Sequence, residues 1–174
     1  MAEAPDLSVP RRVHVVAAGG AGMSAIATVL AQSGHTVSGS DAADGAALRR
    51  LEDLGVRVQV GHTADAVEGA DSRRELLPSF AVRQPFLSVA GTHGKTTTSS
   101  MLAVALDRAG EAPSFLVGAE VAALGAAAGF RDGKYLVLEA DESDATFLAG
   151  PRAGALVTNL EPDHLEFWGG WDQL

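Results

Sequence analysis

One run of this 174-residue sequence has the composition of a phosphate-binding loop. The run GTHGKTTT at 91–98 follows an apolar segment and precedes a helix-like one. Small residues let the backbone wrap around phosphate oxygens, and a helix N-terminus offers free N–H groups with partial positive charge. Lys95 would reach the terminal phosphates of a nucleoside triphosphate, and the Thr96 hydroxyl would bind Mg²⁺. Because Val89-Ala90 precede the first glycine, the spacing differs from G-x-x-x-x-G-K-[ST], and a plain strand–turn–helix is the alternative.

Acidic residues follow a second apolar segment. The segment at 135–138 runs into EADESD at 139–144. Mg²⁺ prefers one or two carboxylates together with substrate oxygens, so Glu139 is the expected metal carboxylate. The alternative is a solvated acidic loop, which is the better interpretation for Asp144 taken alone.

A third apolar segment, 155–158, runs into NLEPDH at 159–164. His164 is either a metal ligand or a phosphate contact, although a lone histidine is more often structural. Ligands of open α/β sheets gather outside the carboxyl ends of strands. We therefore expect Lys95, Glu139, Asn159 and His164 to lie at one edge of a sheet.

The N-terminal run AAGGAG at 17–22 predicts a second, weaker phosphate-binding turn. It has Ala17 where G-x-G-x-x-G has its first glycine, but Gly19 and Gly22 remain and a helix-like segment follows. Asp41 follows Gly22 by 19 residues, which is the spacing of an acid that contacts a ribose. The pattern indicates a dinucleotide-binding module, or else a tight turn whose glycines serve packing only.

Strands and helices alternate in the predicted fold. Expected strands are 13–18, 36–39, 56–60, 86–90, 114–117, 135–139 and 155–158, and expected helices are 23–33, 46–54, 72–77 and 96–109. This alternation predicts parallel sheets. The run of 19 residues from 13 to 31 resembles a signal or membrane segment in hydropathy, but its central glycines favour strand, turn and helix.

Composition excludes several classes of function. The chain has 13 Lys and Arg against 22 Asp and Glu, a net charge of −9, and no cysteine. It therefore has no disulfide scaffold, no Cys-ligated zinc and no thiol catalysis. The acidic balance argues against broad nucleic-acid binding, which needs a basic face. A hydrophobic content of 47% is enough for a real core.

The motifs GGAGMS (19–24), SGSD (38–41), GTHGKTTT, EADESD and TNLEPDH (158–164) occur in this order. Together they resemble the Mur ligase family, and within it the branch that joins L-alanine to UDP-N-acetylmuramate. The resemblance implies an α/β chain: a Rossmann-like parallel sheet unit followed by a partial P-loop-type central domain. It also implies a cytoplasmic, ATP- and Mg²⁺-dependent ligase of peptidoglycan precursor synthesis. In such an enzyme ATP phosphorylates the muramoyl carboxylate, and the amine of L-alanine attacks the acyl phosphate.

The resemblance also implies roles for individual residues. Lys95, Glu139 and His164 would be catalytic, with Thr96, Glu139 and His164 at Mg²⁺. The implied ATP contacts are Gly91, Thr92, His93, Gly94, Lys95, Thr96 and Thr97. The implied contacts with the UDP substrate are Gly19, Gly20, Ala21, Gly22, Met23, Ser24, Asp41 and Asn159, with His93 also facing the substrate.

The chain departs from the family pattern in several places. We expect a loose tail at 1–12, a shortened UDP-substrate unit at 13–71, a linker at 72–85 and a partial ATP-binding domain at 86–174. The same resemblance implies an internal deletion near 71–72 and the absence of a C-terminal amino-acid-binding domain. We therefore expect no ligation by this chain alone, with a second chain as one source of the missing domain. A nucleotide- or UDP-sugar-binding module without catalysis, a non-functional remnant and, last, a nicotinamide oxidoreductase are the alternatives.

Overall fold

The computed structural model describes residues 7–61, 83–140, 152–163 and 165–173. The first unit contains β1 (Arg12–Val16), α1 (Ala21–Gln32), β2 (Thr36–Asp41), α2 (Ala46–Asp53) and β3 (Arg57–Val60). Its three strands are parallel, in the order β1-β2-β3. Within the described residues, the predicted alternation of strands and helices in the first unit is confirmed. The apolar run 13–31 folds as strand, turn and helix, and no described helix is long and apolar enough to cross a membrane.

Local sequence explains where α1 ends. Gly34 adopts a φ of +91°, a left-handed conformation that glycine reaches without steric cost. The N–H of Gly34 donates to the carbonyl of Ala31, and the N–H of His35 donates to that of Leu30. This pair of bonds satisfies the last carbonyls of the helix in a Schellman motif. The chain can then turn directly into β2.

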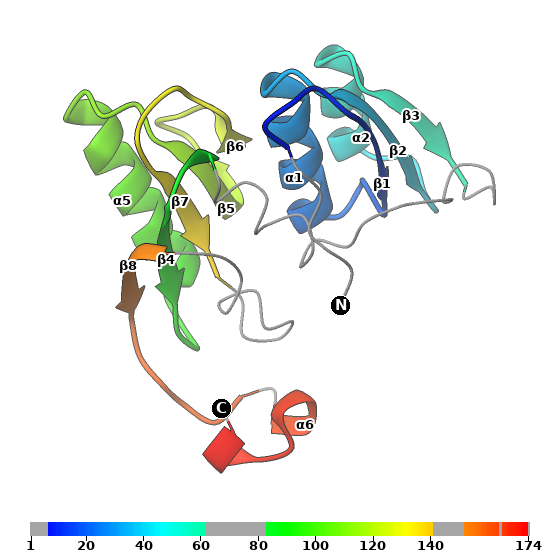
Figure 1. Ribbon diagram of the computed structural model, residues 1–174. Coiled ribbons are helices and arrows are strands. Elements are labelled where there is room, and N and C mark those ends of the chain that lie inside the picture. The colour runs from blue at the N-terminus through cyan, green and yellow to red at the C-terminus, as the bar shows by residue number, and fades with distance from the viewer. Residues whose placement is uncertain (1–6, 62–82, 141–151, 164, 174) are drawn as a thin grey trace.

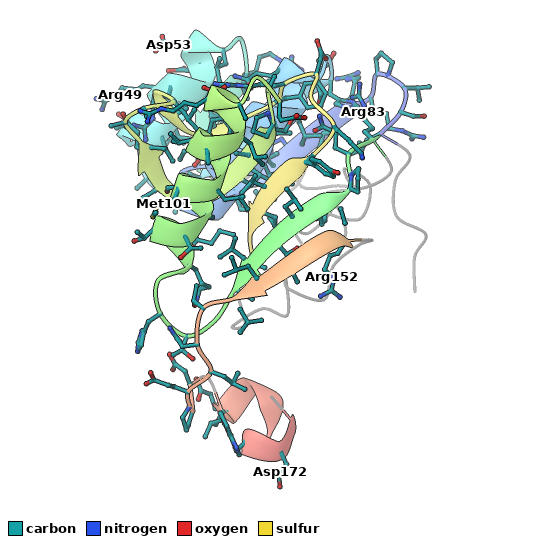
Figure 2. The ribbon with its side chains drawn as sticks, turned by 90° about the vertical axis from the view of Figure 1, so that its left-hand side faces the viewer. Arg49, Asp53, Arg83, Met101, Arg152 and Asp172 are labelled. Atoms are coloured by element: carbon teal, nitrogen blue, oxygen red, sulfur yellow. The ribbon has the colours of Figure 1, made fainter. Side chains whose placement is uncertain are left out.

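The second unit contains β4 (Phe86–Ala90), α5 (Lys95–Arg108), β5 (Ser114–Val121), β6 (Ala126–Gly129), β7 (Leu136–Glu139) and β8 (Arg152–Val157). The strand order is β6-β5-β7-β4-β8. All neighbours are parallel except β6, which runs antiparallel to β5. In Figure 2, Arg152 marks the outer strand β8, and Met101 points away from the molecule on α5.

The β5–β6 hairpin corrects the sequence analysis, which expected no strand at 126–129. These residues are only alanine and glycine, so they carry no alternation of apolar and polar side chains. Gly125, with a φ of +72°, lies in the turn between the two strands. The hairpin also extends β5 beyond its expected end at 117, as far as Val121.

Helix α1 lies between the two sheets, whereas α5 covers the far face of the second sheet (Figure 1). Ile26 and Leu30 of α1 are almost fully buried in one core with Leu116 and Leu138 of the second unit. Between the units, the Gln32 side-chain oxygen accepts a hydrogen bond from the Phe130 N–H at 2.7 Å. This shared core holds the two glycine turns in a defined relative position.

The two ends of the chain differ in how they pack. Leu7 is 2% exposed and belongs to the core, and β1 already begins at Arg12, so the expected tail at 1–12 is too long. At the other end, α6 (Leu165–Trp168) and the 3₁₀-helix η2 (Trp171–Gln173) lie apart from both sheets (Figure 1). The expected helix 72–77, most of the linker 72–85 and the junction at 71–72 lie outside the described residues.

Candidate functional site

The loop at 91–94 is shaped by two glycines. Gly91 and Gly94 adopt φ values of +128° and +80°, which L side chains rarely adopt. A Cβ on Gly91 would lie 2.3 Å from the Thr158 hydroxyl oxygen, so the loop contacts the end of β8 directly. Gly94 is the N-cap of α5, which begins at Lys95. The loop therefore leads into a helix N-terminus whose first N–H groups have no partner within the helix.

Glu139 is held by both of its carboxylate oxygens. The Thr96 hydroxyl donates to Oε1 at 2.8 Å, and the Gly118 N–H donates to Oε2 at 2.6 Å. Thr96 comes from the first turn of α5, Gly118 from β5 and Glu139 from the carboxyl end of β7. A Cβ on Gly118 would lie 2.9 Å from both carboxylate oxygens, so a side chain here would move the carboxylate from this position.

A cavity of about 300 Å³ opens between the N-termini of α1 and α5. Its lining combines both units: Ala21, Gly22, Ala25, Ile26, Thr96, Leu116, Val117, Gly118 and Glu139. Two helix N-termini therefore meet beside one carboxylate. Helix N-termini bind anions through free N–H groups and the helix dipole. The carboxylate and hydroxyl supply oxygen ligands of the kind that Mg²⁺ prefers.

A second groove, of about 500 Å³, shares Ala21, Ala25 and Gly118 with this cavity. It runs between α1, α2 and the β5–β6 hairpin. Ser24 lies in its lining, and Arg50 and Glu120 approach each other there at 3.9 Å. The two openings are therefore neighbours, one lined by residues of the first unit and of the hairpin, the other also by Glu139.

Ala17, at the first position of the N-terminal turn, adopts a backbone conformation that favours glycine. Ala17 adopts a φ of +56°, and the Gly20 N–H donates to its carbonyl at 3.0 Å. Ala17 is exposed. The turn therefore forms in spite of Ala17, at the cost of a left-handed conformation in a residue with a Cβ.

Asp41 lies against this turn. Its Oδ2 accepts the Gly19 N–H at 2.8 Å, and its Oδ1 accepts the Ala43 N–H at 3.1 Å. A Cβ on Gly19 would lie 2.8 Å from Oδ2, so a side chain here would move the Asp41 carboxylate from this position. The Gly19 N–H is thus bound by a carboxylate, and an anion at this turn must use the following first-turn N–H groups of α1.

Asn159, which follows β8, binds the backbone of the loop at 91–94. Its Oδ1 accepts the His93 N–H and its Nδ2 donates to the His93 carbonyl, both at 2.9 Å. The His93 ring is exposed, with Nε2 at 3.8 Å from a carboxylate oxygen of Glu161. The Thr92 hydroxyl accepts the Glu161 N–H at 3.0 Å. The end of β8 therefore supports the loop backbone.

The structure thus brings together part of the predicted site. Thr96 and Glu139 meet at the smaller cavity with Ala21 and Gly22, and Lys95 lies beside Thr96 with Nζ at 3.5 Å from the Thr92 carbonyl. Met23 and Ser24 follow in the first turn of α1, and Thr97 is exposed in that of α5.

His164 and Asp144 lie outside the described residues. Among the described residues, no group of three or more His, Asp or Glu side chains is arranged to hold a metal ion.

Sequence reasoning missed Gly118 and Thr158 as site residues. Gly118 follows the apolar segment 114–117, and Thr158 ends the apolar segment 155–158. A place at the end of an apolar segment is the same signal that identified Glu139 and Asn159. Gly118 was overlooked because its contribution is a backbone N–H and the absence of a side chain. Thr158 was assigned to a strand, whereas its hydroxyl donates to the His93 carbonyl at 2.6 Å.

Both halves of the chain match one enzyme family. The Mur ligase family catalytic domain matches residues 12–97, and the Mur ligase middle domain matches residues 89–174. The UDP-N-acetylmuramate–L-alanine ligase of Symbiobacterium thermophilum is 43% identical over 92% of this chain. That of Xylella fastidiosa strain M23 is 44% identical over 91% of it. This chain belongs to the Mur ligase family.

Solved Mur ligase structures share the fold. A UDP-N-acetylmuramate:L-alanyl-γ-D-glutamyl-meso-diaminopimelate ligase from Neisseria meningitides has a TM-score of 0.78 and 28% identity, covering 92% of this chain and 64% of that one. The UDP-N-acetylmuramate–alanine ligase MurC from Thermotoga maritima has a TM-score of 0.74 and 26% identity, covering 91% and 43%. The α/β Mur ligase fold expected from the sequence is therefore confirmed.

The chain spans about 39% of the length of the curated Mur ligases that it matches. The alignment with the Symbiobacterium relative covers 187 residues, whereas 92% of 174 residues is about 160. That relative therefore carries about 27 residues, within the aligned span, that this chain lacks. This difference agrees with the expected internal shortening, while its position near 71–72 stays a prediction.

Proposed function

We propose that this chain forms the UDP-N-acetylmuramate- and ATP-binding part of a ligase that joins L-alanine to UDP-N-acetylmuramate in peptidoglycan precursor synthesis. The observation that carries the proposal is the cavity where the N-termini of α1 and α5 meet beside Glu139 and Thr96. The N-termini of α1 and α5 would each bind an anion, on either side of the Glu139 carboxylate that would bind the metal ion. This arrangement suits two phosphate-bearing substrates that must react with each other.

At the second unit, the proposed ligand is Mg·ATP. The first-turn N–H groups of α5 and the Lys95 ammonium would hold the phosphates, and the contacts would come from the loop 91–97. The Thr96 hydroxyl and the Glu139 carboxylate lie 2.8 Å apart, and these oxygen ligands fit Mg²⁺, which completes its shell with water and phosphate oxygens. The ion would supply positive charge that neutralises the phosphate oxygens. His164 is proposed as a further contact near a second Mg²⁺.

At the first unit, the proposed ligand is the UDP part of UDP-N-acetylmuramate. The first turn of α1 would hold the diphosphate, because the Gly19 N–H already binds Asp41. Asp41 would keep the turn in shape and lie near the uridine. The groove of about 500 Å³ and the cavity of about 300 Å³ share part of their lining, so an extended ligand can reach from this turn to Glu139.

The proposed reaction has two steps. An oxygen of the muramoyl carboxylate attacks the γ-phosphorus of ATP and releases ADP, and the amine of L-alanine then displaces phosphate from the acyl phosphate to form the amide. The described residues catalyse the first step by positioning and charge, without a protein nucleophile. The amino-acid site would come from the parts of the relatives that this chain does not match, supplied by further sequence or by a second chain. We propose a cytoplasmic location.

Thermal unfolding with each ligand tests the proposal. A ligand at 100 times its Kd that binds only the folded state stabilises it by about 2.7 kcal/mol, which is a shift of several degrees. We expect separate upward shifts of Tm with Mg·ATP and with UDP-N-acetylmuramate, and loss of the ATP shift in Lys95→Ala. An absent ATP shift in a cooperatively folding wild-type chain would refute the ATP site.

A phosphate-release assay with UDP-N-acetylmuramate, L-alanine and Mg·ATP then addresses catalysis. We expect binding of both nucleotides without turnover by the 174-residue chain alone. Turnover by the pure chain would overturn this expectation. Binding that no complementary Mur ligase fragment converts to turnover would favour a nucleotide-binding module over a ligase part.

A further inference from the structure

The backbone of His93 is bound on both sides by side chains from the end of β8. Its N–H donates to Oδ1 of Asn159 at 2.9 Å. Its carbonyl accepts hydrogen bonds from Nδ2 of Asn159 at 2.9 Å and from the Thr158 hydroxyl at 2.6 Å. Asn159 therefore binds both polar groups of one residue, as a neighbouring strand would. Only the amide orientation with oxygen toward the N–H satisfies both groups.

These contacts determine how the His93–Gly94 peptide is turned. In a planar trans peptide, the carbonyl of His93 and the N–H of Gly94 point in opposite directions. Two donors draw the His93 carbonyl toward β8, so the Gly94 N–H points away from β8. The Gly94 φ of +80° is one of two conformations that glycine adopts readily, and a peptide flip would reach the other. The loop sequence itself permits both orientations.

We propose that Asn159, assisted by Thr158, is a positioning residue that keeps the Gly94 N–H directed toward the phosphates. This inference rests on the proposed function of the loop in binding Mg·ATP. A flipped peptide would present the His93 carbonyl oxygen to the phosphate oxygens, and like partial charges would repel. Asn159 thereby acts through the loop backbone, and the substrate contact expected from the sequence stays a prediction.

The side-chain contacts of Asn159 and Thr158 with the His93 backbone, here called the clamp, lie at the surface. Their loss should therefore leave the core intact. The contacts of Asn159 with His93 are exposed, and the loop keeps a second attachment through the Thr92 hydroxyl, which donates to the Glu161 carbonyl at 3.2 Å. Removing the Asn159 amide should therefore change the orientation of one peptide more than the stability of the fold. This difference separates a positioning role from a purely structural one.

The test uses three variants and two measurements. Asn159→Ala removes both bonds, Asn159→Asp keeps an acceptor for the His93 N–H but places an anion beside its carbonyl, and Thr158→Val removes one donor. Gln59→Glu, on β3 of the first unit, makes the same amide-to-carboxylate change away from the loop. Amide hydrogen exchange of His93 and Gly94 by NMR, without ligand, reports the peptide orientation. Calorimetric titration with Mg·ATP reports affinity.

We expect Asn159→Ala to speed exchange of the His93 amide and to weaken Mg·ATP binding about tenfold, the scale of one or two hydrogen bonds. Asn159→Asp should keep the His93 amide protected yet still weaken ATP binding, and Thr158→Val should weaken it less. The control should match wild type. Unchanged ATP affinity in folded Asn159→Ala and Asn159→Asp overturns the proposal.

The failure of the ATP site itself would look different. If the wild-type chain binds no Mg·ATP, the proposed function fails, while the exchange measurement still decides whether Asn159 holds the peptide. Unchanged exchange at His93 and Gly94 in Asn159→Ala would then overturn the clamp independently. If Asn159→Ala does not fold, Thr158→Val carries both measurements with the same expected direction.

Discussion

The backbone N–H of Gly118 lies 2.6 Å from Oε2 of Glu139, although 21 residues separate them. This contact fixes the carboxylate on one side while the Thr96 hydroxyl fixes it on the other. A glycine at 118 is therefore part of the proposed metal site, because any side chain would displace the carboxylate.

Gly118→Ala should weaken Mg²⁺-dependent ATP binding without unfolding the chain. The new Cβ would lie 2.9 Å from both carboxylate oxygens, whereas the φ of Gly118 is outside the left-handed region and accepts alanine. Gly154→Ala is the matched control, since its Cβ would meet only the Leu87 side chain at 3.5 Å. Calorimetric titration of each variant with Mg·ATP checks the prediction. Equal affinity in the two variants would contradict it.

Glu139→Gln should weaken the effect of Mg²⁺ on ATP binding by at least about 10-fold, because the amide keeps the size of the side chain but loses its charge. Circular dichroism should show an unchanged fold. Glu52→Gln, an exposed position on α2, removes one negative charge elsewhere and serves as the control. ATP titrations at several Mg²⁺ concentrations measure the effect. A Mg²⁺ dependence equal to that of the control would remove Glu139 from the metal site.

Ala17→Gly should stabilise the chain. The left-handed φ of +56° costs an alanine about 1–2 kcal/mol, and glycine removes this cost. The greater freedom of glycine in the unfolded state offsets about 0.4–1 kcal/mol of the resulting gain in stability. We expect a net gain of up to about 1.6 kcal/mol in the free energy of unfolding, measured with urea. Ala42→Gly, at an exposed position whose φ is not left-handed, should destabilise instead. A loss of stability in Ala17→Gly would show that the turn relaxes in solution.

His35 should make the fold less stable in mild acid. Burial lowers the pKa of His35 below 6.5, and the positive charges of Arg83 and Arg11 lower it further. Its Nδ1 accepts the Arg11 N–H at 3.1 Å, and its Nε2 is buried without a hydrogen-bond partner among the described residues. As pH falls through 6.5, the unfolded chain takes up a proton that the folded chain refuses, so stability falls until the folded pKa is reached.

Urea unfolding at pH 7.5 and pH 5.5 measures this effect, with His35→Gln as the neutral comparison. The wild-type chain should lose more stability between the two pH values than His35→Gln does. Gln retains an acceptor for the Arg11 N–H but cannot take up a proton in this range. Equal losses would show that His35 titrates normally in the folded chain.

The sequence by itself determined the alternation of strands and helices, the two glycine turns and the family. These features depend on local properties: the period of apolar residues, the freedom of glycine and the order of short motifs. The strand 86–90 was predicted with its observed bounds, because a mostly apolar, largely buried strand has a clear local signal. The β6 strand was missed because alanine and glycine carry no such signal.

Tertiary structure decided where the polar side chains of the site point. Asp41 binds Gly19, Asn159 binds His93, and Glu139 lies between Thr96 and Gly118. Each of these contacts joins residues at least 21 positions apart, so it depends on strand order and on helix α1 packing between two sheets. Local sequence specifies that a carboxylate or an amide follows a strand. The backbone groups that fold back beside it determine which partner it binds.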